Sequence, residues 1–251
     1  MNSAPVLDTP IAATDYLGAV QRIKEMALDR TRAYAVEAAA TQPITMARHT
    51  AEFRAVMDRF DLVLPDGMPL VWVLNRKLPA DQRIKDSVNG ATLMATTLEH
   101  TQGQPEFSHF LLGGAPDTLE LLKETFASRF PGARIADTYS PPFGAWDEAE
   151  IEKMFHLIRE SGASLIWVGL GCPKQERWIA QHKDRLPPGV YFGVGAAFLF
   201  HAGKVKRSPR ILQKLGLEWL FRLAMEPRRL FTRYAKYNSL YLWYVFRDAL
   251  R

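Results

Sequence analysis

Residues 110–122 read FLLGGAPDTLELL, and this segment decides the fold class. The apolar run 110–112 predicts a short buried strand, which ends at two glycines, Gly113 and Gly114. Pro116 suits the first position of a helix, because the N–H that proline lacks has no partner there. Leucines then recur at helical spacing. The segment therefore predicts a strand that turns directly into a helix.

The same strand-then-helix pattern recurs on the C-terminal side of this segment. Residues 134–138 read as the next strand, and a helix with a capping-box start follows from about residue 147. Residues 164–168 predict a buried strand that ends at a glycine-rich turn before a helix from Pro173, and residues 191–194 predict a further strand. Alternation of this kind favours an α/β fold, with a parallel sheet and helices on both of its faces.

The last part of the chain, residues 204–251, carries more than the whole net positive charge. It holds twelve Lys and Arg against three acids, a net charge of +9, while the full chain has +5 and residues 1–203 therefore have −4. Nine aromatic residues lie between Trp219 and Phe246. Clustered cations beside amphipathic rings are typical of surfaces that bind anionic lipid headgroups. We expect an α/β domain over residues 1–203 and a basic, aromatic-rich, helical membrane-binding appendage over residues 204–251.

Composition favours a protein that works on a membrane without crossing it. No apolar run approaches the roughly 18–20 residues that span a bilayer. The N-terminus has no basic segment followed by an apolar one, so a secretory signal is not expected. The single cysteine, Cys172, excludes an internal disulfide framework and suits a reducing cytosol. Metal-binding patterns such as CxxC and HExxH are absent.

Ligands of open parallel sheets bind at the carboxyl ends of the strands. Three glycine-bearing strand ends are therefore the candidate sites, and they lie at residues 66–67, 113–114 and 169–175. None of them is a GxGxxG fingerprint or a phosphate-binding Walker loop. Dinucleotide and P-loop chemistry are thus disfavoured, whereas a nucleotide diphosphate at a helix N-terminus is compatible with the pattern.

Seven segments along the chain carry recognisable motifs. They are LPDGMPLVW (64–72), FLLGGAPDTLELL (110–122), YSPPF (139–143), VGLGCPKQERWI (168–179), GVGAAF (193–198), AGKVKRSP (202–209) and GLEWLFRLAMEPRR (216–229). The most specific part is the order GxPKQE and then GLEWLxRLxxEPxR. In this order the segments resemble the WecG/TagA/CpsF family of bacterial glycosyltransferases, glycosyltransferase family 26.

The resemblance implies a Rossmann-like, inverting glycosyltransferase that needs neither a metal ion nor a cofactor. The implied donor is a UDP-sugar carrying a hexose or an N-acetylhexosamine, and the implied acceptor is a sugar linked to polyprenyl pyrophosphate. Such a transfer belongs to the biosynthesis of bacterial surface polysaccharide or exopolysaccharide. The implied location is the cytoplasm, peripheral on the inner face of the cytoplasmic membrane.

Asp66 is the implied catalytic base, because an inverting transfer needs a carboxylate to take the proton of the acceptor hydroxyl. From spacing alone it also reads as a turn or N-cap aspartate. Gln175 lies in the first turn of a helix, where backbone N–H groups are suited to a diphosphate. The implied substrate-binding residues are Thr41, Gln42, Gly67, Arg83, Asn89, Gly113, Gly114, Tyr139, Gly171, Pro173, Lys174, Gln175 and Glu176.

For some of these residues a structural interpretation stays open. The two glycines of residues 113–114 also suit a tight strand-to-helix turn, and Tyr139 also suits simple packing. The stretch 40–43 departs from the Thr-x-Asn-Pro of the family, with Ala40 and Gln42 at the Thr and Asn positions, and Leu199 stands where the family usually has Asp. These departures leave the identity of the sugar open.

Arginines of the appendage are implied to meet the lipid pyrophosphate or the membrane. Arginine is suited to this because its guanidinium binds phosphate through two parallel hydrogen bonds. The alternative is a solvated basic face. The candidate residues are Arg207, Arg222, Arg229 and Arg233.

Two other classes of protein compete with this interpretation. A nucleic-acid-binding protein would also carry basic and aromatic residues, but it would spread them over the folded domain, whereas here residues 1–203 are net acidic. A nicotinamide-dependent dehydrogenase lacks support because its glycine fingerprint is missing. We therefore expect no nucleic-acid partner. The sequence leaves the donor sugar, the acceptor sugar, the polymer and the oligomeric state open, a homo-oligomer included.

Overall fold

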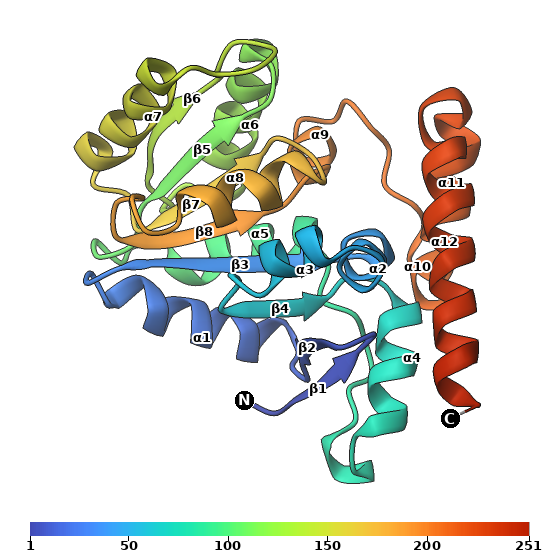
Figure 1. The fold of residues 1–251 in the computed structure, drawn as a ribbon. Coiled ribbons are helices and arrows are strands. Elements are labelled where there is room, and N and C mark those ends of the chain that lie inside the picture. Colours follow the sequence, from blue (N-terminus) through green and yellow to red (C-terminus); the bar gives the residue numbers. More distant parts are fainter. Residues whose placement is uncertain (251) are drawn as a thin grey trace. The chain divides into compact units, whose positions relative to one another are not determined.

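The computed structural model describes residues 1–250, so Arg251, the last residue of the basic segment, lies outside the described residues. The fold is an α/β fold built on a six-stranded sheet with the order β4-β3-β8-β7-β5-β6 (Figure 1). Neighbouring strands from β3 to β6 run parallel. The predicted fold class is confirmed. The strands of this sheet are β3 (Ala33–Ala39), β4 (Leu62–Pro65), β5 (His109–Gly113), β6 (Ile135–Tyr139), β7 (Leu165–Gly169) and β8 (Gly189–Gly193).

Helices follow most of these strands, as the alternating pattern predicts. The segment 110–122 forms the end of β5 and the start of α6, which begins at Pro116. The helices of the chain are α1 (Tyr16–Leu28), α2 (Thr41–His49), α3 (Ala51–Met57), α4 (Met68–Lys77), the short 3-10 helix η1 (Ala80–Gln82), α5 (Gly90–Thr101), α6 (Pro116–Arg129), α7 (Glu148–Ser161), α8 (Lys174–His182), α9 (Ala197–His201), α10 (Arg210–Lys214), α11 (Glu218–Met225) and α12 (Pro227–Ala249).

The chain divides into two compact units, each formed from segments that are separate in sequence. The first unit contains Met1–Asp15, Ala38–Asn89 and Arg207–Arg251, and the second contains Tyr16–Glu37 and Gly90–Lys206. Most of the basic segment thus belongs to the same unit as the N-terminus. The prediction of a separate membrane-binding domain from residue 204 stays a prediction.

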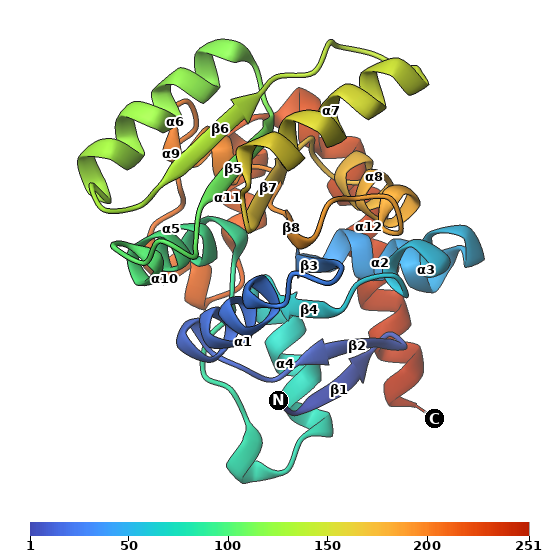
Figure 2. The ribbon, with the colours of Figure 1, turned by 90° about the vertical axis from the view of Figure 1, so that its left-hand side faces the viewer.

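The second unit holds most of the parallel sheet and its aromatic core. Trp167 of β7 stacks on Phe192 of β8, with 4.0 Å between ring centroids. The edge strand β6 is covered by α6 and α7, and α1 packs against α5 (Figure 2). Strands β5, β7 and β8 are almost entirely buried, which explains their continuous apolar runs.

A buried histidine connects this core to a chain of hydrogen bonds. The indole Nε1 of Trp167 donates to Nδ1 of His109 at 3.0 Å, so the imidazole proton must lie on Nε2. That nitrogen is 3.0 Å from Oγ1 of Thr101, whose hydroxyl donates to the carbonyl of Thr97 at 2.7 Å. Both ring nitrogens of His109 therefore have partners in the neutral state.

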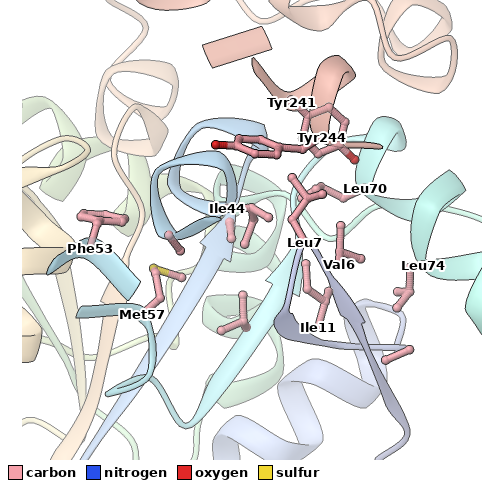
Figure 3. Close-up of a cluster of buried hydrophobic side chains, with 14 of the residues drawn as sticks. Val6, Leu7, Ile11, Ile44, Phe53, Met57, Leu70, Leu74, Tyr241 and Tyr244 are labelled. Carbon is pink, nitrogen blue, oxygen red and sulfur yellow. The ribbon is translucent and has the colours of Figure 1, made fainter. Parts of the chain in front are cut away.

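The first unit has a second hydrophobic core (Figure 3). An antiparallel hairpin of β1 (Ser3–Val6) and β2 (Thr9–Ala12) packs with β4 and with α4, and Phe53 of α3 is fully buried. Helix α12 adds two residues from the basic segment, Tyr241 and Tyr244, which are 3 % and 7 % exposed. The Tyr241 hydroxyl donates to the carbonyl of Pro69 at 2.9 Å. Part of the aromatic content of this segment is therefore core.

Candidate active site

Asp66 lies at the carboxyl end of β4, as the sequence predicts. Its backbone N–H donates to the carbonyl of Ala39 at 3.0 Å, and the preceding carbonyl, of Pro65, accepts from the N–H of Val88 at 2.8 Å. The next residue, Gly67, has φ +104°, a conformation that L side chains rarely adopt, and it is the N-cap of α4. Asp66 is therefore not the N-cap itself. The turn presents a half-buried carboxylate at a strand end on a fixed backbone.

Four other predicted substrate-binding residues lie in the same unit. Thr41 begins α2, and its hydroxyl donates to Oδ1 of Asn238 on α12 at 3.1 Å. Gln42 bonds weakly to Sδ of Met46, at 3.8 Å. Arg83 is exposed after η1. Asn89 accepts a 2.6 Å hydrogen bond from Arg207, so two residues predicted for different roles contact each other.

The arginines of the basic segment interact with carboxylates and with aromatic rings of the same segment. Arg229 forms a 2.9 Å ion pair with Glu226 and is still half exposed. The guanidinium of Arg233 lies over the ring of Tyr234, 5.3 Å from its centroid. Burial raises the pKa of the Glu218 carboxyl, while the charges of Arg207 and Arg222 lower it. Arg207, Arg222 and Glu218 are thus close enough to interact electrostatically.

The second unit contains the remaining predicted residues, and Gln175 is hydrogen-bonded to two of them, Gly171 and Glu176. The Oε1 atom of Gln175 accepts from the N–H of Gly171 at 3.1 Å and from the N–H of Gly195 at 2.9 Å. Its Nε2 donates to Oε1 of Glu176 at 3.2 Å. The side chain is 3 % exposed. Gln175 therefore ties together the loop after β7 and the loop after β8, and its predicted contact with substrate stays a prediction.

Glu37, on β3, is a residue of this region that the sequence analysis missed. It pairs in register with Gly193 of β8, and it is 2 % exposed. Burial raises the pKa of the fully buried Glu176 carboxyl, and hydrogen bonds from its own N–H and from Cys172, Glu37 and Gln175 oppose that rise. The available signal was one charged residue in the otherwise apolar strand AYAVEAA.

The glycines at the end of β5 have a packing role. Gly113 has φ +100°, and a Cβ added there would approach Leu170 Cδ2 to 2.9 Å and the backbone of Gly169 to 3.0 Å. Gly114 has φ +78°, and a Cβ there would lie 3.4 Å from the ring of Phe198. A tight turn that lets neighbouring strand ends approach closely accounts for both residues. Their contact with a ligand stays a prediction.

Tyr139 and Lys174 are engaged with the loop that follows β6 and with α7. The Tyr139 hydroxyl donates to Glu150 of α7 at 2.6 Å. The Lys174 ammonium donates to the carbonyl of Gly144 at 3.0 Å and lies 3.7 Å from the ring centroid of Trp146. Partial burial lowers the pKa of Lys174. Pro173 directly precedes Lys174 and is the N-cap of α8.

In open parallel sheets ligands bind at the carboxyl ends of the strands, which is where Asp66 and the loop of Gln175 lie. The chain matches the glycosyl transferase WecG/TagA/CpsF family over residues 4–251. It therefore belongs to this family of glycosyltransferases, and the resemblance seen in the sequence is confirmed.

Neither a metal site nor a membrane-spanning helix is found in the described chain. Within residues 1–250, no group of three or more His, Cys, Asp or Glu side chains is arranged to hold a metal ion. None of the helices described is both long enough and apolar enough to cross a membrane. Metal independence and attachment to a membrane surface stay predictions.

Proposed function

We propose that this protein is an inverting, metal-independent glycosyltransferase that moves a sugar from a UDP-sugar to a polyprenyl-pyrophosphate-linked sugar at the cytoplasmic face of the membrane. The observation that carries the proposal is Asp66, a carboxylate at the end of β4 whose Pro65–Asp66 peptide group is hydrogen-bonded through both its C=O and its N–H. Membership of the family supports the transfer of a sugar as the reaction class. The donor, the acceptor and the stereochemistry belong to the proposal.

In the proposed reaction, Asp66 takes the proton of the acceptor hydroxyl while the hydroxyl oxygen attacks the anomeric carbon. The bond between that carbon and the UDP oxygen breaks at the same time, so the sugar inverts and UDP leaves as an anion. General-base catalysis by a positioned carboxylate contributes about 10²–10⁴ in rate. Arginines of the basic segment, Arg222 and Arg229 among them, supply the positive charge that phosphates require.

The proposed contact with the membrane is supported by the outer surfaces of α10, α11 and α12. Large apolar side chains are exposed there beside basic ones, a combination typical of helices that lie in the headgroup region. Arg247 lies over the rings of Trp243 and Tyr244, with its guanidinium 4.8 Å and 5.0 Å from their centroids. The exposed apolar residues of this part of the chain are Ile211, Leu215, Trp219, Leu220, Met225, Phe231, Leu242, Trp243, Phe246 and Leu250.

The proposal is tested by incubating the purified full-length protein with a panel of UDP-hexoses and UDP-N-acetylhexosamines. Polyprenyl-pyrophosphoryl-GlcNAc and polyprenyl-pyrophosphoryl-glucose serve as acceptors, each with and without EDTA. We expect one donor to give a glycolipid product of inverted anomeric configuration at a rate that EDTA leaves unchanged. Product with retained configuration, or loss of transfer in EDTA, would contradict the proposed mechanism. Failure of all the donors would contradict the UDP-sugar assignment.

A further inference from the structure

A pair of buried carboxyl groups lies beneath the loop that Gln175 holds. Glu37 comes from β3 and Glu176 from the first turn of α8, and they are 2 % and 0 % exposed. A Cβ built on Gly193 of β8 would overlap Oε2 of Glu37 and lie 3.0 Å from Nε2 of Gln175. The Glu37 carboxyl and the Gln175 amide therefore meet over a residue that has no side chain, and the same amide nitrogen contacts Glu176.

The Glu37 and Glu176 side chains are hydrogen-bonded to each other. Two carboxyl groups in such contact and shielded from water do not both ionise, because the two charges would repel each other with little screening. The pair then holds one proton, and one acid donates to the other carboxylate. Glu176 also accepts from Nε2 of Gln175 at 3.2 Å, which fixes the amide with its oxygen toward Gly171 and Gly195. One of the three hydrogen bonds that orient the Gln175 amide is thus made to the acid pair.

We propose that Glu37 is a positioning residue for the transfer reaction proposed above, on which this inference rests. It shares one proton with Glu176, and the pair orients the Gln175 amide that joins the loops after β7 and β8. Both loops follow the carboxyl ends of strands, where a sugar nucleotide would bind. Glu37 acts on the substrate only through Gln175 and the two loops.

The test uses the full-length protein and three forms of residue 37. Glu37→Gln keeps the shape and the net charge of the pair and supplies a hydrogen-bond donor that needs no shared proton, whereas Glu37→Ala removes the partner of Glu176. Hydrogen exchange at Gly171 and Gly195, expressed as protection factors, is measured from neutral to alkaline pH. We expect the wild type to lose protection as pH rises and Glu37→Gln to keep it. Glu37→Ala should lose about tenfold at neutral pH, the effect of one weakened hydrogen bond.

Two controls separate the carboxyl pair from other causes. Besides Glu37, the side chains hydrogen-bonded to Glu176 include the titratable Cys172 and the neutral Gln175. Cys172→Ala should therefore retain the alkaline loss of protection. Glu99→Gln, an exposed change on α5, should behave as the wild type. The proposal would be overturned if the wild type and Glu37→Gln lost protection equally as pH rises. It would also be overturned if Cys172→Ala no longer lost protection at alkaline pH.

Hydrogen exchange needs no substrate, so this test is independent of the proposed function. If no UDP-sugar is turned over but the exchange results hold, the function is wrong and the acid pair stands. If transfer occurs, the KM for the donor should rise at alkaline pH in the wild type and not in Glu37→Gln. An unchanged KM in both proteins would contradict the positioning role. If Glu37→Ala does not fold, the comparison of wild type with Glu37→Gln decides alone.

Discussion

Asp66 carries the most direct prediction for a single residue. Asp66→Asn keeps the size of the side chain and removes its basicity, so transfer should fall by about 10²–10⁴ in kcat. UDP binding should change little, because the base acts on the acceptor hydroxyl and not on the nucleotide. Transfer assays and calorimetric titration with UDP measure the two effects. The exposed Asp81→Asn is the matched control and should retain activity. Near-normal turnover of Asp66→Asn would remove this residue from the role.

His109 makes a prediction about acid stability. Burial lowers its pKa from an ordinary 6.5 to about 3. Between about pH 6.5 and pH 3 the imidazole is protonated in the unfolded chain but neutral in the folded chain. The free energy of unfolding therefore decreases as the pH falls from about 6.5 to about 3. The loss is about 1.4 kcal/mol per pH unit from this group.

Urea unfolding at several pH values between neutral and mildly acid measures this slope. His109→Gln should be less stable at neutral pH, because it disturbs the bonds to Trp167 and Thr101. The slope of its free energy of unfolding against pH should nevertheless be smaller than that of the wild type, and the difference between the two slopes should be about 1.4 kcal/mol per pH unit. His156→Gln, at an exposed position on α7, should keep the wild-type slope. Equal slopes in all three proteins would show that His109 is not the group that titrates.

At the scale of elements, α12 has one face in the core and another in solvent. Tyr241 is 3 % exposed, whereas the next residue, Leu242, is 67 % exposed. Tyr241→Ala should lower the free energy of unfolding by about 3–5 kcal/mol, the range for large aromatic truncations in a core. Leu242→Ala should change it by less than about 0.5 kcal/mol. Denaturant titration compares the two, and equal effects would mean that α12 is not anchored through its tyrosines.

The sequence predicts the strands of the parallel sheet well and the N-terminal hairpin not at all. Strands β5 and β7 are apolar runs that end at glycines, a strong local signal. The hairpin of β1 and β2 turns at Leu7 and Asp8, both with positive φ, and Leu7 is not one of the residues (glycine, asparagine or aspartate) that usually mark such a turn. Its stability comes from packing on β4 and α4, which sequence neighbours do not reveal.

The candidate site was predictable where a residue follows a strand and less so where it lies inside one. Asp66 and Gln175 stand at strand or helix boundaries, which the alternating pattern locates. Glu37 lies within β3, and only its contacts with β8 and α8 show that it belongs to this region. These two elements are distant from Glu37 in sequence. Tyr241 and Tyr244 read as membrane-facing aromatics, because composition does not distinguish the two faces of α12.

At the scale of the whole molecule, charge is divided along the chain. Residues 1–203 have a net charge of −4 and residues 204–251 have +9. An anionic surface should therefore attract the basic segment and repel the rest. Deleting residues 204–251 would not test this cleanly, because the deletion would also remove Tyr241 and Tyr244 from the core of the first unit. Substitutions on the exposed face of α12 are the appropriate change.

We expect the full-length protein to bind vesicles that contain anionic lipid and to bind neutral vesicles much more weakly. Each Lys or Arg near an anionic surface contributes about 1 kcal/mol. Binding should weaken as salt is added, since the Debye length shrinks from about 10 Å at 0.1 M to about 3 Å at 1 M.

The double change Leu242→Ser and Phe246→Ser should weaken binding by at least about tenfold, because each large apolar side chain contributes about 1.5–3 kcal/mol when fully buried. Vesicle co-sedimentation measures these effects. The matched control is Leu17→Ser with Leu28→Ser, two exposed leucines of α1, which should leave binding unchanged. Equal losses in the two double variants, or binding that salt does not weaken, would place the membrane contact elsewhere on the chain.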